Sequence, residues 1–252
     1  MGLALCLFLL GGLQLHSAAQ EADRTAISTA LDRSRSFLSS DEISPSLTVV
    51  FVITLLSLAP AMLIMTTSFT RVLVVLGFLR QAMATQQTPP NQVLIGLALF
   101  LTFFIMMPTY VEVDNVAIQP YLRGEFGENG EVRAVQEALK PIRAFMIRQT
   151  RPQDIALFME IAQTGPLDSW EDLPTTPLIP AFMLSEMTKA FQIGFILYIP
   201  FLIIDMVVAS TLMAMGMMML PPIFVSLPFK IIMSVLADGW YLLIESLTRS
   251  YF

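Results

Sequence analysis

Four long apolar stretches constrain this 252-residue chain more than any other feature. They cover residues 47–66, 93–110, 191–216 and 223–247. Because a helix rises 1.5 Å per residue, each is long enough to cross the roughly 30 Å of hydrocarbon in a bilayer. Apolar residues follow one another without the alternation of a barrel strand, and backbone polar groups in lipid must pair within the protein. The sequence therefore predicts an all-α, membrane-associated protein.

The first residues predict a cleaved signal peptide. Residues 3–10 are apolar but too few to span a membrane, and small residues follow at Ser17-Ala18-Ala19. Cleavage after Ala19 removes Cys6 and His16, which are the only cysteine and the only histidine. The mature chain then has no means of forming a disulfide, a His or Cys zinc site, or a Cys or His catalytic pair. Because no Lys or Arg precedes the apolar run, the true start can also lie upstream.

The remaining chain alternates apolar and polar regions, and the signal peptide sets their orientation. A cleaved signal places the mature N-terminus and the long acidic loop outside the cytoplasm. Three prolines in 173–180 predict a linker, after which Ser185 is expected to cap a long helix. The expected divisions are a signal peptide at 1–19, a flexible polar lead-in at 20–46, a hydrophobic helical hairpin region at 47–110, an extracytoplasmic helical segment at 111–188, and a hydrophobic hairpin with a Met-rich loop at 189–252.

The Met-rich loop, residues 213–219, is an unusual use of methionine. It reads Met-Ala-Met-Gly-Met-Met-Met, precedes two prolines, and lies between two apolar stretches. Methionine is unbranched and polarizable, so a ring of such loops forms a deformable apolar seal. A plain apolar turn that only packs is the alternative. The candidate seal residues are Met213, Met215, Met217, Met218 and Met219.

Two charged residues interrupt the last two apolar stretches. Asp205 and Lys230 are equidistant from an apex between Met217 and Met218, so antiparallel helices bring them to the same depth. Charges inside a membrane segment usually pair or line water. The first interpretation is structural, in which pairing within one hairpin fixes its register or pairing fixes contacts between subunits. Prolines at 200, 221, 222 and 228 can shift the register by several residues. A proton or ion path through Asp205 is a second interpretation, and a catalytic carboxylate is the weakest, because no metal or phosphate motif accompanies it.

Glu186 lies just before the third apolar stretch and has two interpretations. An acidic residue in the first turn of a helix compensates the helix dipole. The alternative is an ion pair with a neighbouring subunit.

Several longer motifs, taken together and in order, carry a resemblance to a known family. They are ATQQTPPNQVLIGLALFLT at 84–102, FMLSE at 182–186, AFQIGF at 190–195, PFLIID at 200–205, the Met-rich loop with its prolines at 213–222, SLPFK at 226–230 and DGW at 238–240. From about residue 47 onward the chain resembles the FliP/SctR family of type III secretion export-gate proteins.

The resemblance implies an assembly and a location. About five copies are expected to join four of FliQ and one of FliR in a helical oligomeric pore, with FlhB attached. Unfolded flagellar subunits pass through its centre, and the Met-rich loop surrounds the closed pore. The expected location is the bacterial inner membrane in the flagellar basal body, in contact with lipid, with much of the assembly on the periplasmic side. The family's hydrophobic hairpins are bent.

The resemblance also implies an ion pair between subunits, from Glu186 to Lys230. The Glu186–Lys230 pair competes directly with pairing of Asp205 and Lys230 inside one hairpin, because both pairs use Lys230. At the level of sequence we favour the pair between subunits.

Other functional classes fit less well. A copper transporter would use Met thioethers as soft ligands for Cu(I), but such proteins usually add Cys or His. A small-ion or proton transporter using Asp205 is the main alternative to an export gate. No nucleophile and base pair is apparent, so we expect no enzyme activity. We also expect no cofactor, no bound metal and no nucleic-acid partner.

Overall fold

The computed structural model describes residues 45–85, 88–127, 129–165, 173–217 and 219–252. All of the regular structure in these ranges is helical, and they contain no strand. The all-α prediction is therefore confirmed. The predicted signal peptide at 1–19 and nearly all of the lead-in at 20–46 lie outside the described residues.

The chain forms two compact units, which we describe separately. One contains the described residues 45–63 together with Thr109–Phe182, and the other contains Ile64–Pro108 together with Met183–Phe252. Three long helices each begin in one unit and end in the other: α2 (Pro45–Thr66), α4 (Asn91–Val113) and α8 (Thr175–Ala214). The Met-rich loop and the charged residues singled out above all belong to the second unit.

The described part of the first unit is all helical. Its elements are most of α2 (Pro45–Thr66), the π-helix η1 (Asp114–Ile118), α5 (Gln119–Leu122), α6 (Gly130–Gln149), α7 (Pro152–Ile161) and the start of α8 (Thr175–Ala214). The π-helix packs against α5 and α6. Phe145 of α6 meets Phe182 of α8 edge to face, with ring centroids 5.9 Å apart. Arg143 of α6 donates a hydrogen bond of 2.8 Å to the Thr175 hydroxyl.

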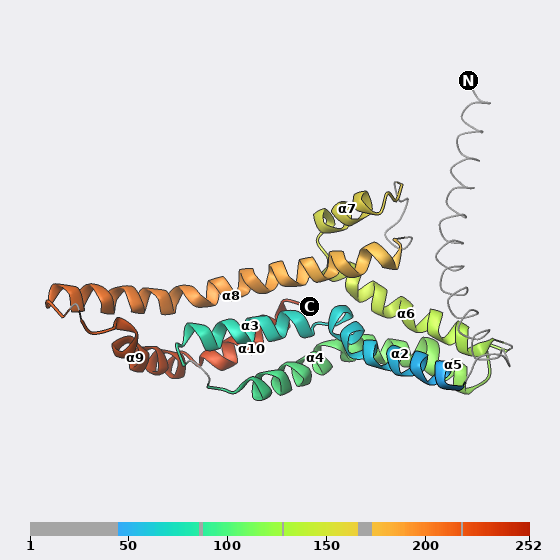
Figure 1. Cartoon of the computed structure of the whole chain (residues 1–252), viewed down its shortest axis with the longest axis horizontal. Helices are drawn as coiled ribbons and strands as arrows, with labels where there is room; N and C mark the ends of the chain where they lie inside the picture. Colours follow the sequence, from blue (N-terminus) through green and yellow to red (C-terminus); the bar gives the residue numbers. More distant parts are fainter. Residues whose placement is uncertain (1–44, 86–87, 128, 166–172, 218) are drawn as a thin grey trace, which may run out of the picture. The chain divides into compact units, whose positions relative to one another are not determined.

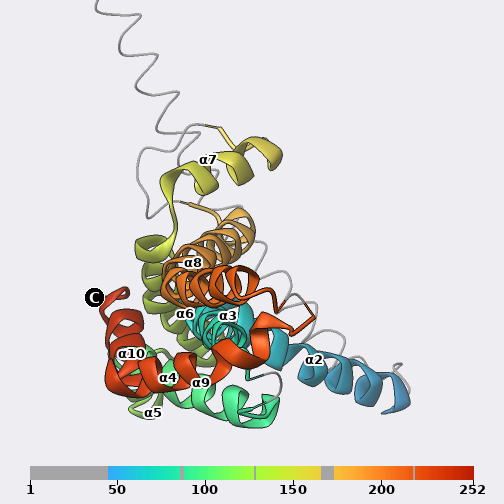
Figure 2. The same cartoon turned by 90° about the vertical axis from the view of Figure 1, so that its left-hand side faces the viewer.

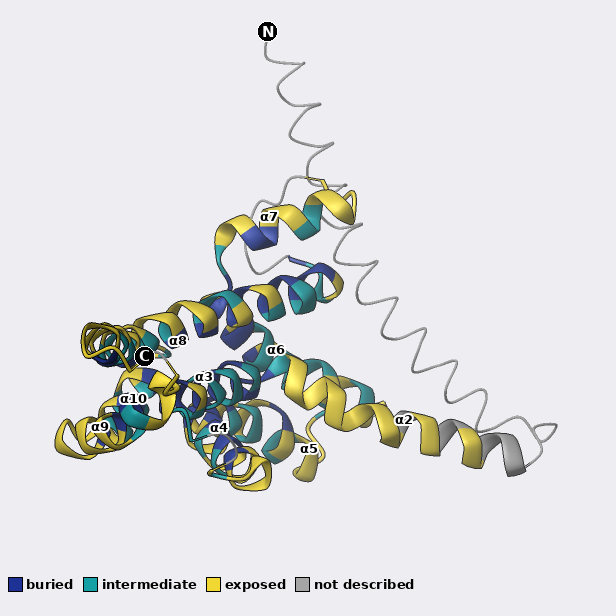
Figure 3. Cartoon of the chain, turned by 60° about the vertical axis from the view of Figure 1, so that its left-hand side comes forward, coloured by how far each residue is buried: buried dark blue, intermediate teal, exposed yellow. Residues whose placement is uncertain are grey.

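The second unit has an apolar core to which four helices contribute. Its elements are α3 (Phe69–Ala82), α4 (Asn91–Val113) up to Pro108, α8 from Met183, α9 (Pro222–Leu236) and α10 (Gly239–Arg249). In Figure 1 α8 runs to the Met-rich loop and the chain returns as α9 and α10. The core has α3 at its centre, and α3 is the most buried of these helices in Figure 3. Its buried residues include Val72, Val75, Leu76, Leu79, Leu94, Ala98, Ala190, Phe201, Leu243 and Leu247.

The apolar regions of the chain are bent at two breaks, as expected. Residues Leu56–Thr66 and Phe69–Ala82 meet at 70°, and Pro222–Leu236 meets Gly239–Arg249 at 62°. At the second break Asp238 has a positive φ of 49°, a conformation that only a short polar side chain or glycine adopts easily. A left-handed residue interrupts the helical hydrogen bonds, so α10 starts in a new direction.

Within the described residues, two helices are long and apolar enough to cross a membrane. They are Asn91–Leu122, in which α4, η1 and α5 follow one another, and Thr175–Ala214. Counting each bent pair as one span gives up to four. These segments correspond to the four apolar stretches of the sequence.

Two predictions are wrong: the linker expected at 173–180 and the helix cap expected at Ser185. α8 begins at Thr175 and continues through Ser185 and Glu186 without a break. Pro177 lies in its first turn, where backbone N–H groups have no helical acceptor, so a proline there costs little. Leu178 and Phe182 are fully buried, and their packing stabilises the helix despite the second proline at 180. Glu186 is consequently a residue of the helix interior rather than of its first turn.

Candidate functional site

The turn after α8 is shaped by Gly216. The Met217 N–H donates to the Leu212 carbonyl at 2.9 Å and the Gly216 N–H to the Met213 carbonyl at 3.0 Å. Gly216 has a φ of 73°. This pair of bonds with a left-handed glycine is the Schellman helix terminus. Pro222 then occupies the first turn of α9, where its fixed φ suits a helix start. Glycine and proline thus make the Met-rich loop a sharp turn between two helices, and Figure 2 looks onto this tip.

The methionines of this turn are exposed rather than packed. Met219 is 98% exposed and Met215 is 71% exposed, and Met213 and Met217 are also exposed. Met218, the fifth predicted seal residue, lies outside the described residues. The four described seal residues therefore do not fill the core of their own chain.

Asp205 and Lys230 form an ion pair within the hairpin. The Lys230 Nζ lies 2.6 Å from Asp205 Oδ2, and the Lys230 side chain is 2% exposed while that of Asp205 is 29% exposed. The pairing predicted from their equal distances to the apex is confirmed. The structure adds Ser226, whose hydroxyl donates to Asp205 Oδ1 at 2.6 Å. Sequence reasoning missed Ser226, although it precedes Lys230 by four residues and so lies on the same helix face.

Glu186 has a different partner within the chain. The Arg71 guanidinium binds its carboxylate through two nitrogens, Nε to Oε2 at 3.0 Å and Nη2 to Oε1. Both side chains are fully buried. Within the chain Glu186 is therefore paired with Arg71 rather than with Lys230, which Asp205 holds. The predicted Glu186–Lys230 pair between subunits stays a prediction.

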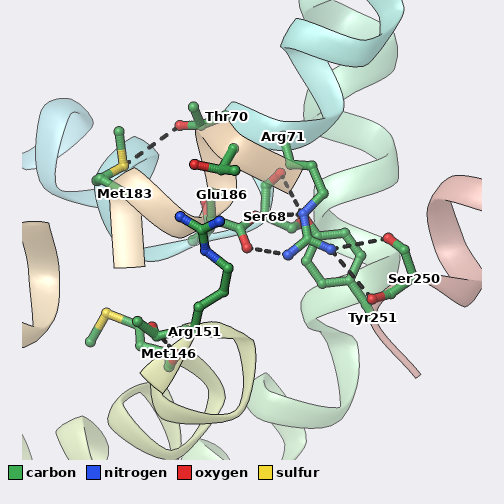
Figure 4. Close-up of polar contacts among 12 residues, drawn as sticks. Ser68, Thr70, Arg71, Met146, Arg151, Met183, Glu186, Ser250 and Tyr251 are labelled. Carbon is green, nitrogen blue, oxygen red and sulfur yellow. Dashed lines mark hydrogen bonds and ion pairs between the residues drawn. The ribbon is translucent and has the colours of Figure 1, made fainter. Parts of the chain in front are cut away.

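The residues that follow α10 complete the environment of this pair. The Tyr251 hydroxyl donates to Glu186 Oε2 at 2.7 Å, and the Tyr251 ring lies 3.8 Å from the Arg71 guanidinium carbon. Arg71 Nη1 also donates to the Ser250 hydroxyl at 3.0 Å. Figure 4 shows these side chains converging from α3, α8 and the end of α10. An arginine inside an otherwise apolar helix was the one sequence signal for this cluster.

The Tyr251 phenol is protonated at neutral pH, as an ordinary tyrosine is. Burial raises the pKa of its hydroxyl well above the usual value, and the negative charge of Glu186 raises it further. The phenol therefore stays protonated and acts as the donor toward the carboxylate. In both clusters the acidic group is paired with a cation and a hydroxyl from other helices or chain segments, an arrangement that holds helices together.

No group of three or more His, Cys, Asp or Glu side chains in the described ranges is arranged to hold a metal ion. The site is thus an exposed apolar tip with two buried polar clusters behind it in the same compact unit.

Comparison with known proteins identifies the family. The family model described as the FliP family matches residues 52–247. The flagellar biosynthetic protein FliP of Bacillus subtilis (strain 168) is 52% identical over 217 residues, which are 85% of this chain and 97% of the relative. The chain belongs to the FliP family. Proteins of the same name from Aquifex aeolicus (strain VF5) and Pectobacterium carotovorum subsp. carotovorum are 50% and 49% identical, over 82% of this chain in each case and over 86% and 79% of the relatives.

Family membership carries a general functional conclusion. Members of the FliP family are components of the flagellar export apparatus and not enzymes. The long apolar helices make this chain a membrane component of that apparatus.

Proposed function

We propose that the chain is the core subunit of the flagellar type III protein export gate. About five copies form, with FliQ and FliR, the channel through which unfolded flagellar subunits leave the cell, and FlhB attaches to this assembly. The gate is in the bacterial inner membrane within the flagellar basal body, with much of it on the periplasmic side. The Met-rich loop seals the channel while it is closed.

The exposed methionines carry this proposal. Four described thioether side chains stand out at one helical tip, with Met219 almost completely exposed. Loops of this kind from several copies around one axis make an apolar constriction, which excludes water and ions. Unbranched thioethers can still move aside for a chain with side chains of varied shape.

The apolar surface behind the tip supports an assembly with other chains and with lipid. Phe100, Phe103 and Phe104 of α4 are each more than half exposed, and so are Ile203 and Met206 of α8. Exposed apolar patches of this extent mark interaction surfaces. Neighbouring subunits and lipid are the partners that cover them in the proposed gate.

The alternative, a small-ion or proton transporter using Asp205, has less support. Both carboxylate oxygens of Asp205 are engaged, one by the Lys230 ammonium and the other by the Ser226 hydroxyl. A carboxylate held between two donors is typical of a structural pair of charges in an apolar segment.

Shortening the methionines tests the seal. Replacing Met213, Met215, Met217 and Met219 together by Ala removes most of the apolar volume of the tip while keeping the Gly216 turn. We expect cells with this variant to leak small ions while secretion of flagellar subunits persists. Two measurements check this, ion flux across the membrane and the amount of flagellar subunit in the medium.

Two further variants give the experiment its controls. Met206→Ala removes a methionine that is 63% exposed and lies on α8 before the tip, and we expect no leak. Replacing the four tip residues by Leu keeps their apolar volume, but the branched side chains are stiffer than methionine. We expect this variant to have a tight membrane and reduced export. Membranes that stay tight in the Ala variant, with the protein present at normal amounts, would contradict the seal.

A further inference from the structure

Three distant stretches of chain meet at Arg71. Its Nε and Nη2 bind the Glu186 carboxylate, its Nη1 donates to Ser250, and its flat face lies against the Tyr251 ring. Glu186 is 115 residues from Arg71, and Ser250 is 179 residues from it. An arginine offers a planar fork of donors and a face for an aromatic ring at once, which lysine does not.

The hydrogen bond from Tyr251 to Glu186 closes a long loop of chain. These two residues are 65 positions apart, and between them lie the rest of α8, the Met-rich loop, α9 and α10. We name this segment, residues 187–250, the Met arm. The Asp205–Lys230 pair joins the two sides of the arm once more, 25 residues apart. The arm is therefore held by polar contacts at its base and again part-way toward its tip.

We propose that Arg71, Glu186 and Tyr251 form a clasp that positions the Met arm, with Tyr251 as the positioning residue that locks the arm's returning end to its outgoing end. The clasp is set in the apolar core of the second unit, because Arg71 lies on α3 beside the buried Val72. It thus fixes both ends of the arm against the same helix.

The clasp lies far from the tip, so a small change of tilt at the clasp moves the tip by a larger distance. From Glu186 to the end of α8 the helix extends roughly 40 Å, at 1.5 Å per residue. A small change of tilt at the base is therefore amplified at the exposed methionines. The clasp is independent of any export function, whereas its effect on ion tightness rests on the proposed function of the Met-rich loop.

Hydrogen–deuterium exchange on the full-length, detergent-purified chain tests the clasp directly. Tyr251→Phe keeps the ring over Arg71 but removes the hydroxyl that donates to Glu186. Loss of a hydrogen bond to a charged partner should speed amide exchange in α10 and α9 by about 10-fold or more. Arg71→Lys keeps the charge but loses the fork, and should produce a larger increase. Amides of α6, in the other compact unit, should exchange at the same rate in all variants.

Tyr241→Phe is the matched control. Tyr241 lies on α10 and is 61% exposed, so the same chemical change there should leave exchange unaltered. Equal exchange in the Tyr251→Phe and Tyr241→Phe variants would overturn the clasp. The comparison uses only the two Tyr→Phe variants, so it holds even if Arg71→Lys prevents folding.

A second readout separates positioning from simple stability. In cells, Tyr251→Phe should increase ion leak per assembled complex at least about twofold, whereas a merely stabilising contact would lower the amount of complex and leave the leak per complex unchanged. If the Ala variant of the Met-rich loop does not leak but exchange responds to Tyr251→Phe, the seal fails and the clasp stands. If the Ala variant leaks and exchange does not respond, the clasp alone fails.

Discussion

Lys230 Nζ lies 2.6 Å from Asp205 Oδ2, although the whole Met-rich loop separates the two residues along the chain. They are equidistant from the apex of that loop, so the ion pair forms only when the two sides of the hairpin are in one register. A shift by one helical turn would leave a nearly buried ammonium without its carboxylate. The pair therefore specifies how far the methionines project beyond it.

Removing one partner of this pair should cost more than removing both. Lys230→Met leaves the Asp205 carboxylate without its cation, and we expect a loss of about 2–3 kcal/mol in the free energy of unfolding, below the 3–5 kcal/mol typical of fully buried pairs because Asp205 is 29% exposed. The double variant with Asp205→Asn should recover part of the loss, with a coupling energy of about 1–3 kcal/mol. Denaturant unfolding in detergent measures all four proteins of the cycle.

The exposed pair on α10 is the control for that cycle. Arg249 and Glu245 form an ion pair in which the Arg249 side chain is 79% exposed, and Arg249→Met should change stability by no more than about 0.5 kcal/mol. Additive effects of the Asp205 and Lys230 changes would mean that the pair does not stabilise the hairpin.

Charge reversal distinguishes pairing within a chain from pairing between chains. Glu186→Lys places a second positive charge against Arg71, so we expect the isolated chain to be destabilised and assembly to fail. Arg71→Glu added to it should restore the stability of the isolated chain, since the swapped pair can re-form. Lys230→Glu added to it should restore part of the assembly if Glu186 and Lys230 pair between copies.

Two measurements report these outcomes. Thermal unfolding of the chain alone detects whether Arg71→Glu restores its stability. The native mass of the complex purified with FliQ and FliR detects whether Lys230→Glu restores assembly. Rescue of the complex by Arg71→Glu alone would show that Glu186 acts through its partner within the chain, whereas rescue by Lys230→Glu, despite the second carboxylate it sets beside Asp205, would show a pair between copies.

Gly194 is a contact point at which a single methyl group should matter. A Cβ built there lies 2.5 Å from Phe78 Cδ2 and 2.6 Å from Cγ, and the Phe78 ring is held edge to face against Phe191 at 5.3 Å. Gly194→Ala should therefore lower the free energy of unfolding by about 1–3 kcal/mol through overpacking. Denaturant unfolding is again the measurement.

Gly96 provides the comparison for this substitution. It lies on α4 with no atom within 4 Å of a built Cβ, so Gly96→Ala should be neutral or stabilising by up to about 1 kcal/mol through helix propensity. Phe78→Ala should relieve the strain of Gly194→Ala. If both alanine substitutions stabilise equally, α3 and α8 do not approach as closely as the structure shows.

Much of the fold was predictable because it depends on composition along the chain. Apolar stretches such as 93–110 extend beyond any turn signal, and backbone groups in such stretches can be satisfied only within a helix. Local rules also located the tip, since Gly216 and Pro222 are the residues that end one helix and start the next. The prediction of a linker at 173–180 was wrong for two reasons. A proline in the first turn of a helix does not break it, and the buried side chains of Leu178 and Phe182 stabilise the helix.

By itself the sequence determined the helical membrane class and the position of the Met-rich turn, because both depend on patterns along the chain. It offered Asp205–Lys230 as one of two competing pairs, and the structure shows that pair within the chain. Only the tertiary structure decided the partners of Glu186. Arg71 and Tyr251 reach it from 115 and 65 residues away, and no local pattern encodes how α3, α8 and α10 pack together. A buried charge needs a partner, but helix packing chooses which one.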